Sequence, residues 1–288
     1  MMAVDIEFTF IDTNHVTLHT ALAGPKDGEL VVLLHGFPEF WYGWRHQIEA
    51  LAEAGYRVAV PDQRGYNLSS KPDGASLYTV DLLRDDVAGL IEQLGYQEAY
   101  WVGHDWGGAV AWYAAATKPK LVKKLTAINI PYPGAMGKAL LRYPPQLLKS
   151  LYMAFFQIPE LPEKLMQTDD LEQMKKGIAM AANPGAFTED DLDRYKTAWA
   201  QPGALTGMLN WYRAIWRKEI RPDLVQVPVR ILWGLGDPFL HKTTAKVSLE
   251  YCAKGELIYI DDATHWVHHE QPDVINRLML EFLQQEKT

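Results

Sequence analysis

The sequence contains a single cysteine, Cys252, among its 288 residues. One cysteine cannot form an intramolecular disulfide, and it cannot supply the several thiolates of a cysteine-rich metal site. The sequence also has no motif typical of a metal site and no glycine-rich loop of the kind that cradles phosphates. We therefore expect no metal and no cofactor, and the low cysteine content fits a reducing compartment.

Long apolar runs and basic clusters are also missing. No run approaches the roughly 18 uninterrupted apolar residues of a membrane-spanning helix. Asp5 and Glu7 stand where a secretory signal peptide would have a basic and then an apolar region. The formal net charge is −8 without any basic stretch, which argues against nucleic-acid binding. We expect a cytoplasmic protein that acts on a small molecule, without membrane or nucleic-acid partners; the sequence does not indicate an oligomeric state.

The chain does contain a regular alternation of strand-like and helical patterns. Residues 5–12 and 15–22 predict an N-terminal hairpin that turns at Thr13-Asn14. From residue 30 onward, apolar runs typical of strands covered on both faces alternate with amphipathic stretches, which indicates a mostly parallel sheet with helices on both faces. The six further strands are expected at 30–36, 57–62, 100–102, 125–131, 227–234 and 256–261, and the helices at 44–54, 79–94, 109–117, 243–253 and 273–285.

The alternation breaks between Tyr132 and about Lys218. No central strand is evident there, Pro and Gly interrupt short helical patterns, and aromatic residues and Met are frequent. We expect one core, residues 1–131 and 219–288, with a helical cap of residues 132–218 inserted after the sixth strand. Ligands bind at the carboxyl edge of the strands in open α/β sheets, so such a cap would cover the site.

The stretch VGHDWGG, residues 102–108, joins an expected strand to an expected helix. Glycines two places before and after Asp105 are what a nucleophile elbow requires, because larger side chains would collide around its strained central residue. The usual residue at that apex is Ser or Cys. An Asp predicts instead that its carboxylate attacks a saturated carbon and forms an ester on the enzyme.

An ester on Asp105 must be hydrolysed by water, and a His is suited to activate that water. His265 follows the last strand, in DDATHWVHHEQP, and is closer to the strand end than the two rival histidines of that stretch. Asp237, in WGLGDPFL, is the expected acid that orients His265 and stabilises its protonated form. The rival position for this acid, after the preceding strand, holds the uncharged Asn129.

The stretch HGFPE, residues 35–39, supplies the oxyanion hole that ester hydrolysis requires. Gly36 permits a tight backbone turn, and the N–H groups of Phe37 and Trp106 are the expected donors to the oxyanion. Phe37 and Trp106 are also expected to bind substrate. The Trp106 indole could alternatively bind a leaving halide or form part of the cavity wall.

These motifs resemble those of the epoxide hydrolases within the α/β-hydrolase superfamily. HGFPEFWYGWRHQ, PDQRGYNLSSKP, VGHDWGG and the loops of Asp237 and His265 are similar to that family's pattern in order and spacing, over essentially the whole chain. The resemblance implies the α/β-hydrolase fold and two cap tyrosines that hold and protonate the epoxide oxygen. By their contexts, YMAFFQ and NWYR, these would be Tyr152 and Tyr212.

The resemblance thus implies an epoxide hydrolase that turns an apolar epoxide and water into a vicinal diol through an ester on Asp105. The same machinery would serve a dehalogenase, but haloalkane enzymes commonly have Asn in place of Phe37, and fluoroacetate enzymes have Arg in place of Trp106. Asp105 disfavours a Ser-type esterase, while a non-catalytic ligand-binding protein of this fold stays open. Gln63 and Asn67 depart from the family's common apolar residue and glycine, although Asn tolerates positive φ.

Overall fold

The computed structural model describes residues 4–217 and 223–285, so the expected boundary at 218/219 lies outside the described residues. Eight strands form one sheet in the order β1-β2-β4-β3-β5-β6-β7-β8. β2 pairs antiparallel with β1 and β4, and every pair from β4 to β8 is parallel, which confirms the expected sheet. The strands are β1 Glu7–Thr13, β2 Val16–Ala23, β3 Leu30–Leu34, β4 Arg57–Pro61, β5 Ala99–His104, β6 Val122–Ile128, β7 Val225–Gly234 and β8 Cys252–Ile260.

The N-terminal hairpin turns one residue later than the sequence predicts. Thr13 still pairs with Val16, and the two residues between them, Asn14 and His15, have φ of 41° and 63°. Positive φ at both central residues is typical of the type I′ turn, whose twist matches that of the flanking strands. The prediction of Thr13-Asn14 as the turn was therefore wrong by one position.

Helices cover both faces of the sheet because its inner strands are apolar on both sides. In β3, Val31 and Leu33 pack with the helices of one face, and the alternate residues Leu30 and Val32 pack with those of the other. The first face carries α1 (Arg45–Glu53) and α13 (Pro272–Gln284); the second carries α2 (Val80–Gln93), α3 (Asp105–Thr117) and α11 (Lys242–Leu249). Short helices in the connecting loops are η1 Trp41–Trp44, η2 Ala75–Tyr78, η3 Pro119–Leu121 and α12 Val267–Glu270.

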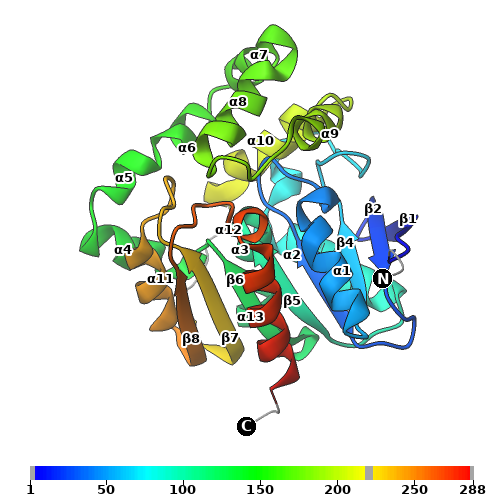
Figure 1. Ribbon diagram of the computed structural model, residues 1–288. Coiled ribbons are helices and arrows are strands. Elements are labelled where there is room, and N and C mark those ends of the chain that lie inside the picture. Colours follow the sequence, from blue (N-terminus) through cyan, green and yellow to red (C-terminus); the bar gives the residue numbers. More distant parts are fainter. Residues whose placement is uncertain (1–3, 218–222, 286–288) are drawn as a thin grey trace.

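The described chain between β6 and β7 forms helices and loops without a strand, as the sequence predicts. Figure 1 shows α6 to α10 above one edge of the sheet. These helices are short because Pro and Gly separate them, for example at Pro144-Pro145 and at Pro202-Gly203. The helices between β6 and β7 are η4 Pro133–Ala135, α4 Met136–Arg142, α5 Gln146–Lys149, α6 Leu151–Phe155, α7 Leu161–Met166, η5 Thr168–Leu171, α8 Glu172–Ala181, α9 Glu189–Trp199, α10 Ala204–Ala214 and η6 Ile215–Arg217.

Within residues 4–217 and 223–285, none of the helices combines the length and the apolar composition needed to cross a bilayer.

Candidate active site

Asp105 lies at a sharp turn between β5 and α3 and has φ of 46°, in the left-handed region that residues with a side chain seldom adopt. The glycines around it are required by close backbone contacts. A Cβ on Gly107 would lie 2.2 Å from the Leu34 carbonyl oxygen, and one on Gly103 would lie 2.6 Å from the Gly107 carbonyl oxygen. The strained turn predicted from the sequence is therefore present, and it places the Asp105 carboxylate at the edge of the sheet.

The loop after β3 lies directly against Asp105. A Cβ on Gly36 would come within 2.4 Å of the Asp105 Cβ, so only glycine allows this approach. The next residue, Phe37, donates its backbone N–H to Asp105 Oδ1 at 2.9 Å. Across the described residues, no hydrogen bond joins the Trp106 amide to this carboxylate. The Trp106 N–H belongs instead to the first turn of α3, where amides have no partner within the helix.

His265 bridges the two predicted carboxylates. Its Nδ1 lies 2.8 Å from Asp237 Oδ2, and its Nε2 lies 3.7 Å from Asp105 Oδ2. The three residues follow β8, β7 and β5, which are parallel strands, so their side chains meet at the same edge of the sheet. The structure therefore brings together the predicted nucleophile, His and acid in one row.

Asp237 is buried but richly hydrogen-bonded. Its Oδ1 accepts the backbone N–H groups of Phe239 and Leu240 at 2.7 and 2.8 Å, and its Oδ2 accepts the Asn129 amide at 2.7 Å. Burial alone would raise the pKa of Asp237, but the charge and hydrogen bond of His265, followed by these other donors, lower it. Asn129, the rival position in the sequence, thus contacts Asp237 and helps to keep it ionised.

The pKa of His265 is raised to about 9 in the resting protein. Burial lowers it, but the carboxylate of Asp237 and then that of Asp105 raise it more, because both stabilise the imidazolium. Formation of an ester on Asp105 would remove one of these negative charges. The pKa of His265 would then fall, and its neutral form, which can accept a proton from water, would become more populated.

Tyr152 on α6 and Tyr212 on α10 line the same cavity as Asp105, from the opposite side. Their ring centroids are 6.0 Å apart, and Tyr212 packs edge-on against Trp106 at 5.0 Å. Burial, and then the Asp105 charge, raise the pKa of Tyr152; burial, and then the neighbouring Tyr152, raise that of Tyr212. Both phenols therefore stay protonated across the neutral pH range.

Comparisons with known proteins agree with this geometry. A family model described as the alpha/beta hydrolase fold matches residues 29–272. AB hydrolase superfamily protein YfhM of Bacillus subtilis (strain 168) is 51% identical over 96% of this chain and 98% of its own length. Human Epoxide hydrolase 4 is 37% identical over 96% of this chain and 78% of its own length.

A solved structure points to the same family. The crystal structure of Bacillus megaterium epoxide hydrolase in complex with an inhibitor matches with a TM-score of 0.88 and 33% identity, over 96% of this chain and 100% of that one. The chain belongs to the epoxide hydrolase family. Its α/β-hydrolase fold and its class of enzyme, a hydrolase, follow from this membership.

Two cavities of this epoxide hydrolase family member share Asp105, Tyr152 and Tyr212 in their walls, and we call them the larger and the smaller lobe of the site. The larger lobe has a volume of about 380 Å³ and the smaller one about 120 Å³. Phe37 lines the larger lobe and Trp106 the smaller one, so each residue predicted to bind substrate faces a different lobe. Apolar side chains make up most of both walls, which suits a small apolar ligand.

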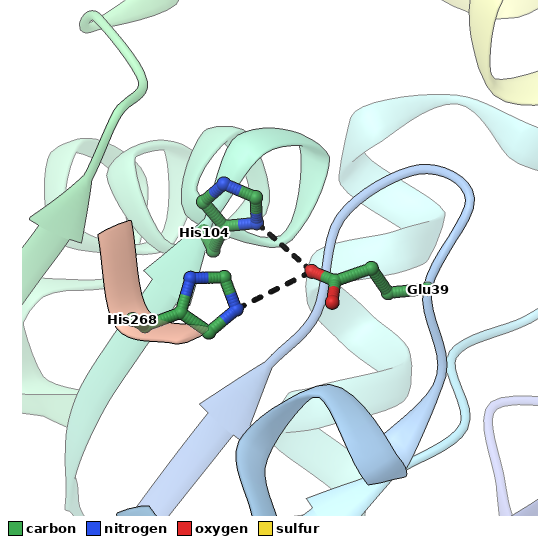
Figure 2. A group of neighbouring side chains, drawn as sticks. All are labelled: Glu39, His104 and His268. Atoms are coloured by element: carbon green, nitrogen blue, oxygen red, sulfur yellow. Dashed lines mark hydrogen bonds and ion pairs between the residues drawn. The ribbon is translucent and has the colours of Figure 1, made fainter. Parts of the chain in front are cut away.

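A second buried polar group lies beside the row of Asp105, His265 and Asp237, centred on Glu39. Tyr195 and His269 contact Glu39 Oε1, both at 2.7 Å. His104 Nδ1 and His268 Nε2 lie 3.1 and 3.4 Å from Oε2, as Figure 2 shows. Burial would raise the pKa of Glu39, but His269, His268 and His104 together hold it well below its usual value, so the carboxylate is ionised.

Three residues of this group could in principle hold a metal ion. Glu39, His104 and His268 offer ligand atoms that lie within 4.8 Å of one another, and all three residues are buried. His104 Nε2 lies 2.9 Å from the His265 carbonyl oxygen, so the ring of His104 joins Glu39 to the His265 loop. The hydrogen bonds and ion pairs account for the burial of Glu39, and we assign the group a role in positioning the loop of His265.

Glu39 was not among the residues predicted from the sequence. The available signals were the acidic residue that ends HGFPE and the two consecutive histidines, His268 and His269, that follow His265. His268 and His269, the sequence rivals of His265, face Glu39, and only His265 of the three lies within salt-bridge distance of Asp105 among the described residues. A buried carboxylate provides partners for the histidines that the predicted site does not use.

Proposed function

We propose that this hydrolase converts an apolar epoxide and water into a vicinal diol, with Asp105 as nucleophile. The observation that carries the proposal is the placement of two phenols, Tyr152 and Tyr212, across the cavity from a carboxylate on a nucleophile elbow. A strained ether needs both an attacking nucleophile at carbon and a proton donor at oxygen. Relatives named epoxide hydrolase support the same conclusion.

In the first step, an oxygen of Asp105 attacks an epoxide carbon. A carbon–oxygen bond of the ring breaks as the ester bond to Asp105 forms, and a phenol of Tyr152 or Tyr212 gives its proton to the departing oxygen. Oδ1 of Asp105 accepts the Phe37 N–H, whereas Oδ2 faces His265 at 3.7 Å. Oδ2 is therefore the better nucleophile, because Oδ1 carries the stronger hydrogen bond.

In the second step, His265 removes a proton from water, and the resulting hydroxide attacks the ester carbonyl carbon. If Oδ2 carries the alkyl group, Oδ1 is the carbonyl oxygen and already accepts the Phe37 N–H. That donor, together with the Trp106 N–H, would stabilise the oxyanion, and one such donor lowers the activation barrier by about 3–4 kcal/mol. Collapse releases the diol and the Asp105 carboxylate, and the proton on His265 returns through solvent to the tyrosinate.

We further propose that residues 132–218 act as a cap over a core of residues 1–131 and 219–288. The helices of this insertion supply both tyrosines and most of the larger lobe, whereas the core supplies Asp105, Asp237 and His265. Closing the site from water strengthens its electrostatic interactions and favours attack by a single activated water molecule. The cytoplasmic location expected from the sequence stays a prediction.

A substrate panel tests the proposed function. The purified protein would be assayed with epoxides, haloalkanes, haloacetate and an activated ester, beside a double variant, Tyr152→Phe and Tyr212→Phe. We expect diol formation from epoxides and a fall of at least about a hundredfold in the double variant, because general acid catalysis contributes that much or more. Halide release without epoxide turnover would reject the proposal in favour of a dehalogenase, and full epoxide activity in the double variant would reject the role of the tyrosines.

A further inference from the structure

The larger lobe of the cavity reaches the protein surface between α7 and α8. Three of its lining residues, Leu165 on α7 and Gln173 and Gly177 on α8, are exposed to solvent, and Leu165 is 49% exposed. By contrast, none of the described residues that line the smaller lobe is exposed. This opening offers a ligand a route into the larger lobe, whose wall includes Asp105.

Gly177 is an unusual residue for this position. It lies inside α8, where glycine is less favourable than almost any other residue because it loses more conformational freedom. A Cβ built on Gly177 meets no atom within 4 Å, and its φ lies outside the left-handed region. Gly207 on α10 differs, since a Cβ there would lie 2.5 Å from the Gly65 carbonyl oxygen. Neither packing nor backbone conformation requires a glycine at 177.

Gly177 lies on the face of α8 that lines the larger lobe, where a side chain would narrow the lobe. Gln173, Met174, Gly177 and Ile178 all line the larger lobe, and residues four apart lie on the same face of a helix. Met174 and Ile178 are buried at the inner side of this face, while Gln173 and Gly177 are exposed at its outer side. A side chain at 177 would therefore occupy the mouth of the lobe.

We propose that Gly177 is a specificity-determining residue that keeps the mouth of the larger lobe open for neutral epoxides with a long or bulky apolar substituent. The inference rests on the proposed epoxide hydrolase function. Among the described residues that line this lobe, the only charged or amide side chains are those of Asp105, His265 and Gln173, so the lobe suits an uncharged substituent. The substituent would extend from Asp105 toward Gly177, and the smaller lobe, about 120 Å³, would accept the small group on the other epoxide carbon.

The test compares graded variants of Gly177 with a matched control. Gly177→Ala, Gly177→Leu and Gly177→Phe would be assayed with 1,2-epoxybutane and with a biphenyl glycidyl ether. Gly137→Phe is the control, because Gly137 is also helical and exposed, a Cβ there meets nothing within 4 Å, and it lines neither lobe. We expect the ratio of kcat/KM for the bulky epoxide to that for the small one to fall from Ala to Leu to Phe, by about tenfold or more in Gly177→Phe.

The outcomes separate this inference from the proposed function. A wild-type protein that turns over neither epoxide would reject the proposed function itself. If the wild type hydrolyses both, an unchanged ratio in Gly177→Phe, or an equal change in Gly137→Phe, overturns the role of Gly177. Thermal unfolding checks the fold of each variant; Gly177→Ala should raise Tm by about 1–3 °C, because alanine favours the helix.

Discussion

At the residue scale, the two oxygens of Asp105 have different surroundings. Oδ1 accepts a backbone N–H from Phe37 at 2.9 Å, and Oδ2 faces the His265 ring at 3.7 Å. Once Oδ2 is esterified, the carbonyl oxygen already lies against its stabilising donor, so the second step requires little rearrangement. In the proposed mechanism, the same asymmetry places His265 beside the ester, where it can activate water.

The division of labour between Asp105 and His265 predicts an accumulating intermediate. In His265→Ala the epoxide should still open, but the ester on Asp105 should persist, and steady-state turnover should fall by about a thousandfold or more. An intact-protein mass spectrum would show the added mass of one substrate, and a peptide map would place it on Asp105. Asp105→Ala is the matched control, because it should bind no substrate covalently. An adduct on any other residue would contradict the mechanism.

The raised pKa of His265 predicts how the second step depends on pH. Only neutral His265 can accept a proton from water, so ester hydrolysis should accelerate as pH rises toward its pKa, which is about 9 before the Asp105 charge is removed and lower afterwards. Tyr152 and Tyr212 have raised pKa values, so they stay protonated and epoxide opening should not decline over this range. Rapid mixing that follows tryptophan fluorescence would resolve both phases. A hydrolysis rate that falls between about pH 6 and about pH 9 would exclude His265 as the base.

The sequence was sufficient to predict that Asp105, Asp237 and His265 lie near one another, but not which residues surround them. Asp105, Asp237 and His265 each follow a recognisable strand, and parallel strands bring their carboxyl ends to one edge without further information. The grouping of partners around Glu39 could not be predicted, because His104, Tyr195 and the 268–269 pair come from segments far apart in the chain. Such a buried group becomes visible only when tertiary packing has brought these segments together.

At the element scale, the sequence predicted the order of strands and helices and missed some of their ends. The expected helix at 243–253 ends at Leu249, because β8 already begins at Cys252. The helix after the elbow begins at Asp105 itself rather than at Ala109, since the strained residue is followed at once by helical backbone. Asn67 has φ of 40° and donates to Asp62, so the turn survives without the family's glycine, as predicted.

The N-terminal cap of α9 can be altered without changing any residue of the proposed mechanism, so its contribution to stability can be measured separately. The Thr188 hydroxyl accepts the Asp191 N–H, and the Asp191 carboxylate accepts the Thr188 N–H, a reciprocal capping box. Asp191 is buried at this position, and its other carboxylate oxygen accepts the hydroxyl of the half-buried Tyr42, a contact that the sequence did not predict.

Thr188→Ala should therefore lower the free energy of unfolding by about 1 kcal/mol and Tm by about 2 °C, without a comparable loss of kcat/KM. Thr197→Ala is the control, because Thr197 lies on the exposed side of the same helix and its hydroxyl bonds only within the helix among the described contacts. Calorimetry measures both variants. An equal Tm for Thr188→Ala and wild type would show that the capping box does not stabilise α9.

At the scale of the whole molecule, α9 and α10 join the insertion to the loops that follow β3 and β4, whereas α4 and α5 join it to α11 and to the loop of Asp237. Tyr195 and Trp199 of α9 donate to Glu39 and to the Pro38 carbonyl oxygen, and Trp211 of α10 donates to the Arg64 carbonyl oxygen. These hydrogen bonds are buried, and the two from α9 reach the loop that supplies Phe37. The two helices therefore fix the position of Tyr212 relative to Asp105.

The helices beside the cavity mouth are attached differently. Glu163 of α7 pairs with Arg213 of α10, and Lys175 of α8 pairs with Glu189 and Asp193 of α9. These ion pairs join α7 and α8 to other helices of the insertion, and the chain returns to the core beyond α8, where Asn183 donates to the Asp262 carbonyl oxygen. Because these ion pairs do not reach the core, α7 and α8 should open more readily than α9 and α10, which hydrogen-bond to core residues.

Hydrogen exchange measures this difference directly. Amides of α7 and of the first turns of α8 should exchange at least about tenfold faster than those of α9 and α10, because the ion pairs of α7 and α8 lead to other helices of the insertion, whereas α9 and α10 hydrogen-bond to the core. An apolar epoxide analogue that fills the larger lobe should slow exchange in α7 and α8 and leave the already protected α9 nearly unchanged. Equal protection of all four helices would mean that the insertion moves as one unit. In that case substrate would have to pass through a rigid mouth, and the space left by Gly177 alone would set its width.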